Sequence, residues 1–402
     1  MTKPRRRQAG EGGISAYQTK SGPRFLIKYR FTRENGSAAV AFKRGYLTRK
    51  AAGEALREKL GSVDRGTHVA PNKVTVGEHM AEWLDGLELR PSTVASYRKN
   101  VRLHVTPHIG ALRLEQLTGT RLTALYRQLR ETGRADGNGG LSASTVRYVH
   151  TIIHAGLDAA VGEYLVVNPA DRAKPPSAES AKAPEMHCWT AGELRAFLDQ
   201  RAQAQDELTI AWSLLAATGM RRGEALGLRW GDVDVESARL SVRRSVTVVK
   251  NKGQGEEIIV GPPKSGKART IDLDPGTLAA LKAHKAAMGT LSLALARDDA
   301  YVLANLDGAV RHPERFSRRF VAAVIAARKA VGEDVLSTIR LHDLRHTHAT
   351  LLLADGIPVK VVSERLGHAN AMITLGIYAH VMPGMQGEAA AKFGALLYGT
   401  AK

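Results

Sequence analysis

The spacing of apolar side chains changes along the chain, and the first spacing is that of a β-strand. Between residues 24 and 31 apolar side chains occupy every second position, so Arg24, Lys28 and Arg30 share the opposite face. A turn at residues 34–36, an apolar run at residues 38–42 and a helix from Thr48 to Leu60 follow. Residues 1–70 are therefore predicted to form a small β-sheet with one helix.

Residues 74–170 have helical periodicity and are predicted to form an all-α bundle. The four expected helices are Val76–Leu89, Ser92–Val105, Thr118–Arg130 and Ser142–Val161. Pro107, Gly110, the glycine-rich residues 133–140 and Asn168-Pro169 are expected to separate them, because proline and glycine disfavour helix interiors.

The rest of the chain is predicted to be a linker, a large mixed domain and a tail. Residues 171–187 are rich in Pro, Ala, Ser and Lys, which is typical of a linker. Residues 188–386 are expected to be mainly α-helical, with a small β-sheet between Arg239 and Leu273. Residues 387–402 contain an amphipathic helix that either docks on a neighbouring molecule or frays. The predicted fold class is an α+β multidomain protein.

The charge balance indicates a polyanionic partner. The 402 residues include 58 Lys and Arg against 39 Asp and Glu, a net charge of +19. Residues 1–70 hold 16 of these basic residues and only 5 acidic ones, so we interpret the N-terminal sheet as a DNA reader. The longest apolar run, Phe320–Ala327, is too short to span a membrane, and the single Cys188 excludes an internal disulfide. We therefore expect a cytoplasmic, DNA-associated protein.

Three clusters in residues 188–386 could carry chemistry. In the first, Gly219 is expected to end one helix and Arg221 to begin the next, where the first-turn amides favour anions. Taken alone, the neighbouring pair Arg221-Arg222 is more typical of a solvated surface pair balanced by Glu224 than of an anion site.

The second cluster is His342-Asp-Leu-Arg-His-Thr-His348. On a helix, His342 and Arg345 share a face and can bind one oxyanion together. His342 and His346 also have the spacing of zinc ligands, with His348 nearby, but Arg345 would place a cation against the metal. Anion binding, metal binding and simple packing all stay open for this segment by itself.

The third cluster is Leu366-Gly-His368, followed ten residues later by Tyr378. Gly367 is expected to end a helix and turn His368 toward a site. Lys264 is expected in a hairpin turn between two strand-like runs, residues 258–260 and 270–273, where a lysine is usually just solvated.

Taken together, these residues resemble the tyrosine recombinases of the phage and integrative-element integrase type. The family pattern has an arginine in a Gly-Met-Arg-x-x-Glu turn, a hairpin lysine, His-x-x-Arg, Gly-His, and a tyrosine about ten residues later. The matching positions are Arg221, Lys264, His342, Arg345, His368 and Tyr378, with Lys267 as an alternative lysine. The resemblance includes the helical middle unit and the basic N-terminal sheet, so it covers nearly the whole chain.

The resemblance implies site-specific DNA strand exchange without metal, cofactor or ATP, through a 3′-phosphotyrosyl intermediate. It implies that Tyr378 is the nucleophile, His342 the base and Lys264 the acid, with Arg221, Arg345 and His368 on the phosphate. The implied partners are double-stranded DNA at core and arm sites, three further copies in a tetramer on a Holliday junction, an excisionase and a host DNA-bending protein. The residues expected on core DNA are Arg98, Lys99, Arg102 and Arg147.

Three other functions compete with this interpretation. A metal-dependent nuclease would need a carboxylate cluster, whereas Asp232, Asp234, Asp272 and Asp343 have no tight ligand spacing. A DNA-binding regulator would use the basic modules alone. A type IB topoisomerase has a similar catalytic set, but the added N-terminal modules favour recombination.

Overall fold

The computed structural model describes residues 12–32, 37–65, 68–69, 72–182, 186–251, 253, 255–264, 266–378 and 385–399. The chain forms two compact units, Met1–Ala183 and Pro184–Lys402. Within the described ranges, every helix is too short or too polar to cross a bilayer.

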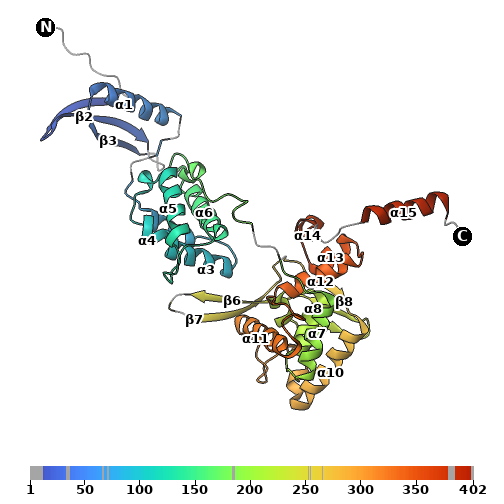
Figure 1. The fold of residues 1–402 in the computed structure, drawn as a ribbon. Helices are drawn as coiled ribbons and strands as arrows, with labels where there is room; N and C mark the ends of the chain where they lie inside the picture. The colour runs from blue at the N-terminus through green and yellow to red at the C-terminus, as the bar shows by residue number, and fades with distance from the viewer. Residues whose placement is uncertain are drawn as a thin grey trace, which may run out of the picture. The chain divides into compact units, whose positions relative to one another are not determined.

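The first unit begins with an antiparallel sheet covered by one helix (Figure 1). The strands are β1 (Gly13–Thr19), β2 (Gly22–Thr32) and β3 (Ala38–Tyr46), and β2 is central. Ile27 and Tyr29 pack with Ala52 and Leu56 of helix α1 (Arg49–Asp64). The predicted alternation in β2 is therefore confirmed, whereas the sequence analysis missed β1. The turn predicted at residues 34–36 lies outside the described residues.

A helical bundle follows the sheet. Its elements are α2 (Val76–Asp85), α3 (Pro91–Asn100), the π-helix η1 (Val101–Val105), α4 (Thr106–Ile109), η2 (Leu114–Gln116), α5 (Gly119–Thr132) and α6 (Ala143–Asp158). Buried apolar side chains from all of these elements except α3 form one core, and Tyr97 of α3 packs against it. Thr75 begins α2 with a capping box that includes Glu78, and Thr118 and Ser142 cap α5 and α6.

The prediction that Pro107 ends a helix is wrong. Helical backbone runs from α3 through η1 into α4, and the N–H of Thr106 bonds the carbonyl of Val101, five residues earlier. A π-turn contains one more residue than an α-turn, so the chain tolerates the proline ring and its missing N–H.

Part of the segment predicted as a linker packs on the bundle. The short helix η3 (Pro169–Arg172) buries Pro169 and Ala170. Farther along, the N–H of Lys174 bonds Thr123 Oγ1 at 2.9 Å, and Arg147 Nη1 donates to the carbonyl of Pro176 at 2.7 Å. These contacts extend the first unit at least to Pro176.

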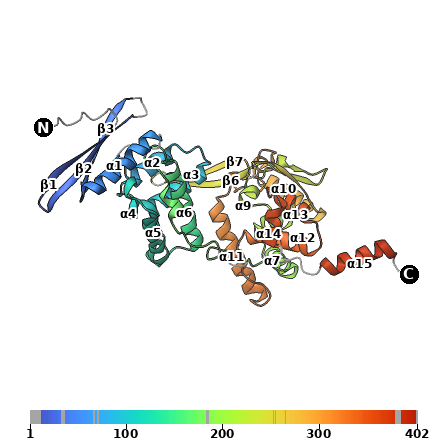
Figure 2. The ribbon, with the colours of Figure 1, turned by 90° about the horizontal axis from the view of Figure 1, so that it is seen from above.

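The second unit is mainly helical (Figure 2). Its helices are α7 (Ala191–Gln203), α8 (Thr209–Thr218), α9 (Arg222–Leu226), η4 (Trp230–Asp232), α10 (Pro275–Leu291), η5 (Leu293–Ala296), α11 (Pro313–Val331), α12 (Asp343–Ala354), α13 (Val359–Leu366), α14 (Ala371–Tyr378) and α15 (Met385–Tyr398). A large apolar core includes the rings of Trp189, Phe197, Trp212 and Phe320, which contact one another. A second, smaller core gathers α12, α13 and Tyr378.

The strands of this unit form two sheets. β4 (Val233–Asp234), β5 (Arg239–Val242) and β8 (Arg269–Asp272) make one antiparallel sheet, in the order β4-β5-β8. β6 (Ser245–Asn251) and β7 (Gly255–Gly261) pair only with each other, as a hairpin that extends from the helices (Figures 1 and 2). The predicted hairpin between residues 258–260 and 270–273 is therefore wrong, because these strands belong to different sheets.

Candidate functional site

Arg221 lies at a sharp junction between two helices. Gly219 ends α8 with a left-handed φ of 62°, and Arg221 is the N-cap of α9. A Cβ on Gly219 would lie 2.7 Å from side-chain atoms of both His348 and Leu366, so a larger residue would clash as well as strain the backbone. The glycine thus lets α8, α12 and α13 meet beside Arg221.

A buried carboxylate holds Arg221 in place. Glu224 is 1% exposed, and its oxygens accept hydrogen bonds from the Arg221 backbone N–H and guanidinium, both at 2.9 Å. Two further bonds, of 3.1 and 2.7 Å, come from Arg269. Burial would raise the pKa of Glu224, but the hydrogen bonds and charge of Arg269 outweigh it and hold the pKa below its ordinary value.

We expect Glu224→Gln to destabilise the second unit by about 3 kcal/mol, because Arg269 is left buried without its counter-ion. Arg221 loses the same partner, so DNA cleavage should fall with it. Urea unfolding followed by tryptophan fluorescence measures the first effect, since Trp189, Trp212 and Trp230 lie in this core. The exposed Glu236→Gln is the matched control. Unchanged unfolding in Glu224→Gln would contradict this account of the clamp.

Arg345 is the second arginine of the site, and it is almost fully buried. It is 3% exposed, and its guanidinium donates to the carbonyls of Gly219 at 2.7 Å and Leu366 at 2.8 Å. Burial, followed by the charge of Arg221, lowers its pKa to about 9, so it remains protonated at neutral pH. The two carbonyls lie two residues before Arg221 and His368, which brings three candidate residues to one place.

Tyr378 ends α14 and is 1% exposed. Its hydroxyl lies 2.6 Å from Nδ1 of His346, not at His342. The His342 and His346 rings meet edge to face, 5.0 Å apart between centroids. Burial raises the pKa of the Tyr378 phenol, although the charge of Arg345 opposes the shift. The phenol is therefore protonated in this state.

His368 follows Gly367, which ends α13 with a φ of 66°. Its Nδ1 lies 2.8 Å from Oγ1 of Thr374 on α14. Burial, and then the charges of Arg345 and Arg221, lower the pKa of His368 to about 4. Since those charges act on it, His368 shares the electrostatic field of both arginines, and it is neutral at physiological pH.

The histidines of α12 have different surroundings. The pKa of His342 is lowered, first by the atoms packed around its ring and then by the charge of Arg345. His348 Nδ1 is 2.8 Å from the carbonyl of Ala216, and its Nε2 accepts a bond from Arg365. Both nitrogens of His348 are thus occupied by structural contacts, which disfavours it as the third metal ligand considered for this segment.

Lys264 differs from the other five candidates. It is exposed, on the segment that leads from β7 in one sheet to β8 in the other. Lys267, the alternative, is also exposed on this segment. The structure thus brings together Arg221, His342, Arg345, His368 and Tyr378, and leaves both lysines at the surface.

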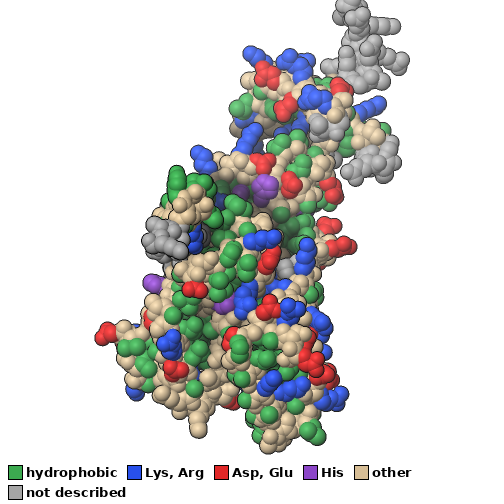
Figure 3. All heavy atoms as spheres, turned by 90° about the vertical axis from the view of Figure 1, so that its right-hand side faces the viewer, with side chains coloured by type: hydrophobic (Ala, Val, Ile, Leu, Met, Phe, Trp, Pro, Cys, Tyr) green, Lys and Arg blue, Asp and Glu red, His purple; other side chains and the backbone are tan. Residues whose placement is uncertain are grey.

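The candidate DNA-binding residues of the first unit have mixed surroundings. Lys28 and Arg30 are exposed, and Arg24 is half-buried, on the face of β2 opposite the core. In the bundle, Lys99 lines an open polar groove between α3 and the start of α6. Arg98 pairs with Asp85 at 2.8 Å, Arg147 bonds the Pro176 carbonyl and Arg102 is exposed. On the face in Figure 3, Lys and Arg side chains are scattered among acidic, apolar and uncharged ones.

Sequence reasoning missed three residues that contact the candidate site. Arg269 and Thr374 were not singled out, and His346 entered only as a possible zinc ligand. Each contacts a residue far away in sequence, so no local motif reveals the pairing. The one usable signal was the spacing of Thr374 and Tyr378, which places both on one helix face.

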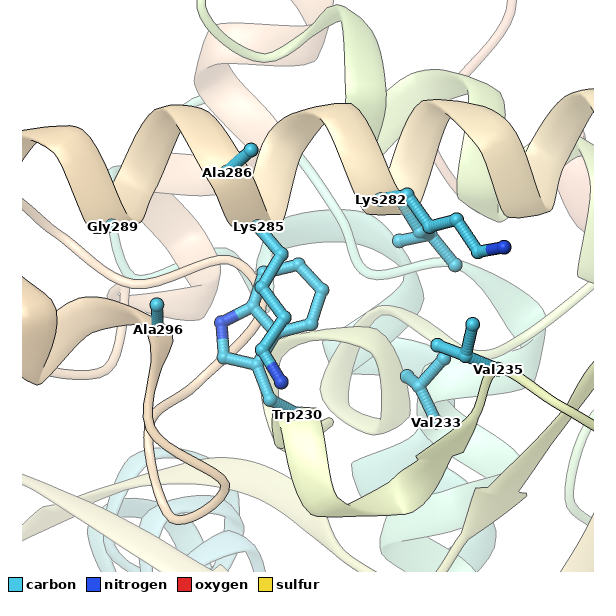
Figure 4. A pocket seen from close by; sticks show the side chains of 9 residues that line it. Trp230, Val233, Val235, Lys282, Lys285, Ala286, Gly289 and Ala296 are labelled. Atoms are coloured by element: carbon cyan, nitrogen blue, oxygen red, sulfur yellow. The ribbon is translucent and has the colours of Figure 1, made fainter.

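An apolar pocket of about 400 Å³ lies elsewhere on the second unit, between α10 and the strand β4 (Figure 4). Trp230 forms one wall, and its indole N–H donates to the carbonyl of Leu295. Lys285 lies over the Trp230 ring, 5.6 Å from its centroid. None of the lining residues belongs to the polar cluster, so this pocket is separate from the candidate site.

The chain is similar to known integrases and tyrosine recombinases. Residues 190–384 match the model of the phage integrase family. The chain is 26% identical to a XerC-like tyrosine recombinase of Caldanaerobacter subterraneus subsp. tengcongensis, over 84% of this chain and 87% of that protein. It is also 26% identical to the ICEBs1 integrase of Bacillus subtilis, over 77% and 80%.

Two solved structures share the fold. The Tn1549 transposon integrase in complex with circular intermediate DNA aligns with a TM-score of 0.64 and 20% identity, over 80% of this chain and 99% of that one. A lambda integrase tetramer bound to a Holliday junction aligns with a TM-score of 0.51 and 17% identity, over 92% and 96%. The α+β multidomain fold predicted from the sequence is therefore confirmed.

Proposed function

Because this chain belongs to the phage integrase family of site-specific tyrosine recombinases, we propose that its polar cluster cuts and rejoins DNA to integrate or excise a mobile element. One observation carries the assignment of the site. Two arginines are held at the junction of α8, α12 and α13, and Tyr378 of α14 lies close enough to Arg345 for the guanidinium charge to act on its phenol. Fixed positive charge beside a tyrosine hydroxyl suits phosphotransfer to a phenol.

The arginines stabilise the transition state. Attack on a phosphodiester builds negative charge on the non-bridging oxygens, and guanidinium groups bind such oxygens with fixed, permanent charge. Arg345 is rigidly held by two carbonyls and Arg221 by Glu224, so neither needs to reorganise during the reaction. His368, whose Nδ1 is occupied by Thr374, turns its Nε2 to the phosphate.

The covalent step conserves the energy of the broken bond. Tyr378 Oη attacks phosphorus, and the bond from phosphorus to O5′ breaks. The phenolic proton passes to His342, whose ring lies against the His346 ring that contacts the hydroxyl before the reaction. Lys264, or alternatively Lys267, gives a proton to O5′. The products are a 3′-phosphotyrosyl ester and a free 5′ hydroxyl. A 5′ hydroxyl from a second duplex reverses the step and joins new partners without ATP.

The remaining modules bind DNA. The helical bundle, through Lys99, Arg98, Arg102 and Arg147, contacts the core site, while Arg24, Lys28 and Arg30 of the N-terminal sheet contact separate arm sites. Strand exchange needs two duplexes and four copies of the chain, with an excisionase and a DNA-bending protein setting direction. Linked modules raise the effective concentration of each at its site.

A nicked suicide substrate carrying the attachment site tests this function. Cleavage releases a short fragment that carries the 5′ hydroxyl, and the loss of this fragment blocks religation. The chain should therefore accumulate as a covalent adduct at Tyr378, which peptide mapping identifies. The adduct should form equally in EDTA. A requirement for divalent metal would favour the nuclease alternative, and tight binding without any adduct would favour a non-catalytic DNA-binding protein.

A further inference from the structure

The helix that carries the nucleophile has two hydroxyl groups, and both face the catalytic unit. They belong to Thr374 and Tyr378, which lie four residues apart on one face of α14. Both residues are buried, at 0% and 1% exposure. The other six residues of α14 are apolar or glycine. Among them, Met372 is 70% exposed. The polar contacts of this helix's side chains are therefore confined to one face.

Each hydroxyl meets the Nδ1 of an imidazole. Thr374 Oγ1 is 2.8 Å from His368, which follows α13, and Tyr378 Oη is 2.6 Å from His346, on α12. The two contacts thus tie one turn of α14 to two different elements of the catalytic unit. Apolar contacts of Tyr378 with the cluster that includes Leu353 and Leu366 support the same seat.

The charge state of both rings follows from their surroundings. Burial, with nearby positive charge, lowers the pKa of both His346 and His368 to about 4, so both are neutral at physiological pH. Burial also raises the pKa of the Tyr378 phenol, which therefore keeps its proton in this state. A neutral imidazole carries its hydrogen on one nitrogen, so each contact joins one donor and one acceptor between the hydroxyl and Nδ1.

We infer that His346 and Thr374 are positioning residues that form, with Tyr378 and His368, a two-point clasp seating α14 on its own catalytic unit. The clasp places the Tyr378 hydroxyl beside the ring of His346 and holds the ring of His368 on α14. This inference rests on the proposed function, because a seat for Tyr378 matters only if Tyr378 attacks DNA.

The test measures the rate of single-turnover adduct formation on the nicked suicide substrate. His346→Phe and Thr374→Val remove one hydrogen bond each while keeping the side chain's bulk, and each should slow adduct formation by about tenfold. His346→Asn keeps an acceptor near the Nδ1 position and Thr374→Ser keeps the hydroxyl, so both should retain most of the rate. The exposed Met372→Ala on the same helix is the control and should cleave normally. Affinity for DNA should be unchanged throughout.

Two results would overturn the clasp. These are an unchanged or faster rate of cleavage by His346→Phe, or an equal loss of rate in Thr374→Ser and Thr374→Val. Failure of the proposed function looks different, because the unmodified chain would then form no adduct with Tyr378 at all.

Discussion

Replacing Tyr378 with phenylalanine abolishes the covalent protein–DNA adduct and leaves DNA binding unchanged. The change removes only the attacking oxygen, because the phenyl ring still fills the apolar cluster formed with Leu353, Val362 and Leu366. The loss of one hydrogen bond to His346 costs about 1 kcal/mol, too little to unfold the unit. Denaturing gel electrophoresis of the suicide-substrate reaction measures the adduct, and a gel-shift titration measures binding.

Tyr301→Phe is the matched control for this prediction. Tyr301 belongs to the same unit, but its ring contacts Arg229 rather than the polar cluster. This variant should form the adduct at the normal rate. An adduct that persists in Tyr378→Phe, or that maps to another tyrosine, would remove Tyr378 from the reaction.

Replacing Arg345 with alanine lowers the cleavage rate by about 10² or more and also destabilises the second unit. The rate falls because the phosphate loses a fixed positive charge in the transition state. The stability falls because the carbonyls of Gly219 and Leu366 lose their buried donors, at about 1–3 kcal/mol for each unsatisfied group. Single-turnover cleavage and urea unfolding measure the two effects separately.

Arg345→Lys separates charge from geometry. One ammonium group keeps the charge but cannot bridge two carbonyls and still present a planar pair of donors to the phosphate. We expect this variant to fold better than Arg345→Ala and yet to cleave slowly. Near-normal cleavage by Arg345→Ala, measured where the variant remains folded, would show that Arg345 is only a structural residue.

The local pattern of the sequence was sufficient for much of the fold. Alternation in β2 identified the buried face of the N-terminal sheet, and Thr48 correctly marked the start of α1. Gly219 and Gly367 were expected to end helices, and both do so with positive φ. These features depend on neighbours within a few residues, so a single sequence contains them.

Strand pairing, and the proline that a helix tolerates, could not be predicted in the same way. The runs around residues 258–260 and 270–273 look like the arms of a hairpin, but β7 pairs with β6 and β8 with β5. Pro107 looks like a helix end, yet a π-turn carries the helix past it. In both cases several local structures are compatible with the sequence, and packing selects among them.

For the candidate site, too, the sequence predicts some features and the tertiary structure decides the others. The sequence alone predicted the chemistry, since two arginines, histidines and a tyrosine in the order of the integrase family imply metal-free cleavage of DNA. Only the tertiary structure decided which groups meet: Glu224 with Arg269, 45 residues away, and His346 rather than His342 with the Tyr378 hydroxyl, 32 residues away. The physical reason is that residue types and their spacing are properties of the chain, whereas hydrogen bonds between distant residues depend on how the helices that carry them pack.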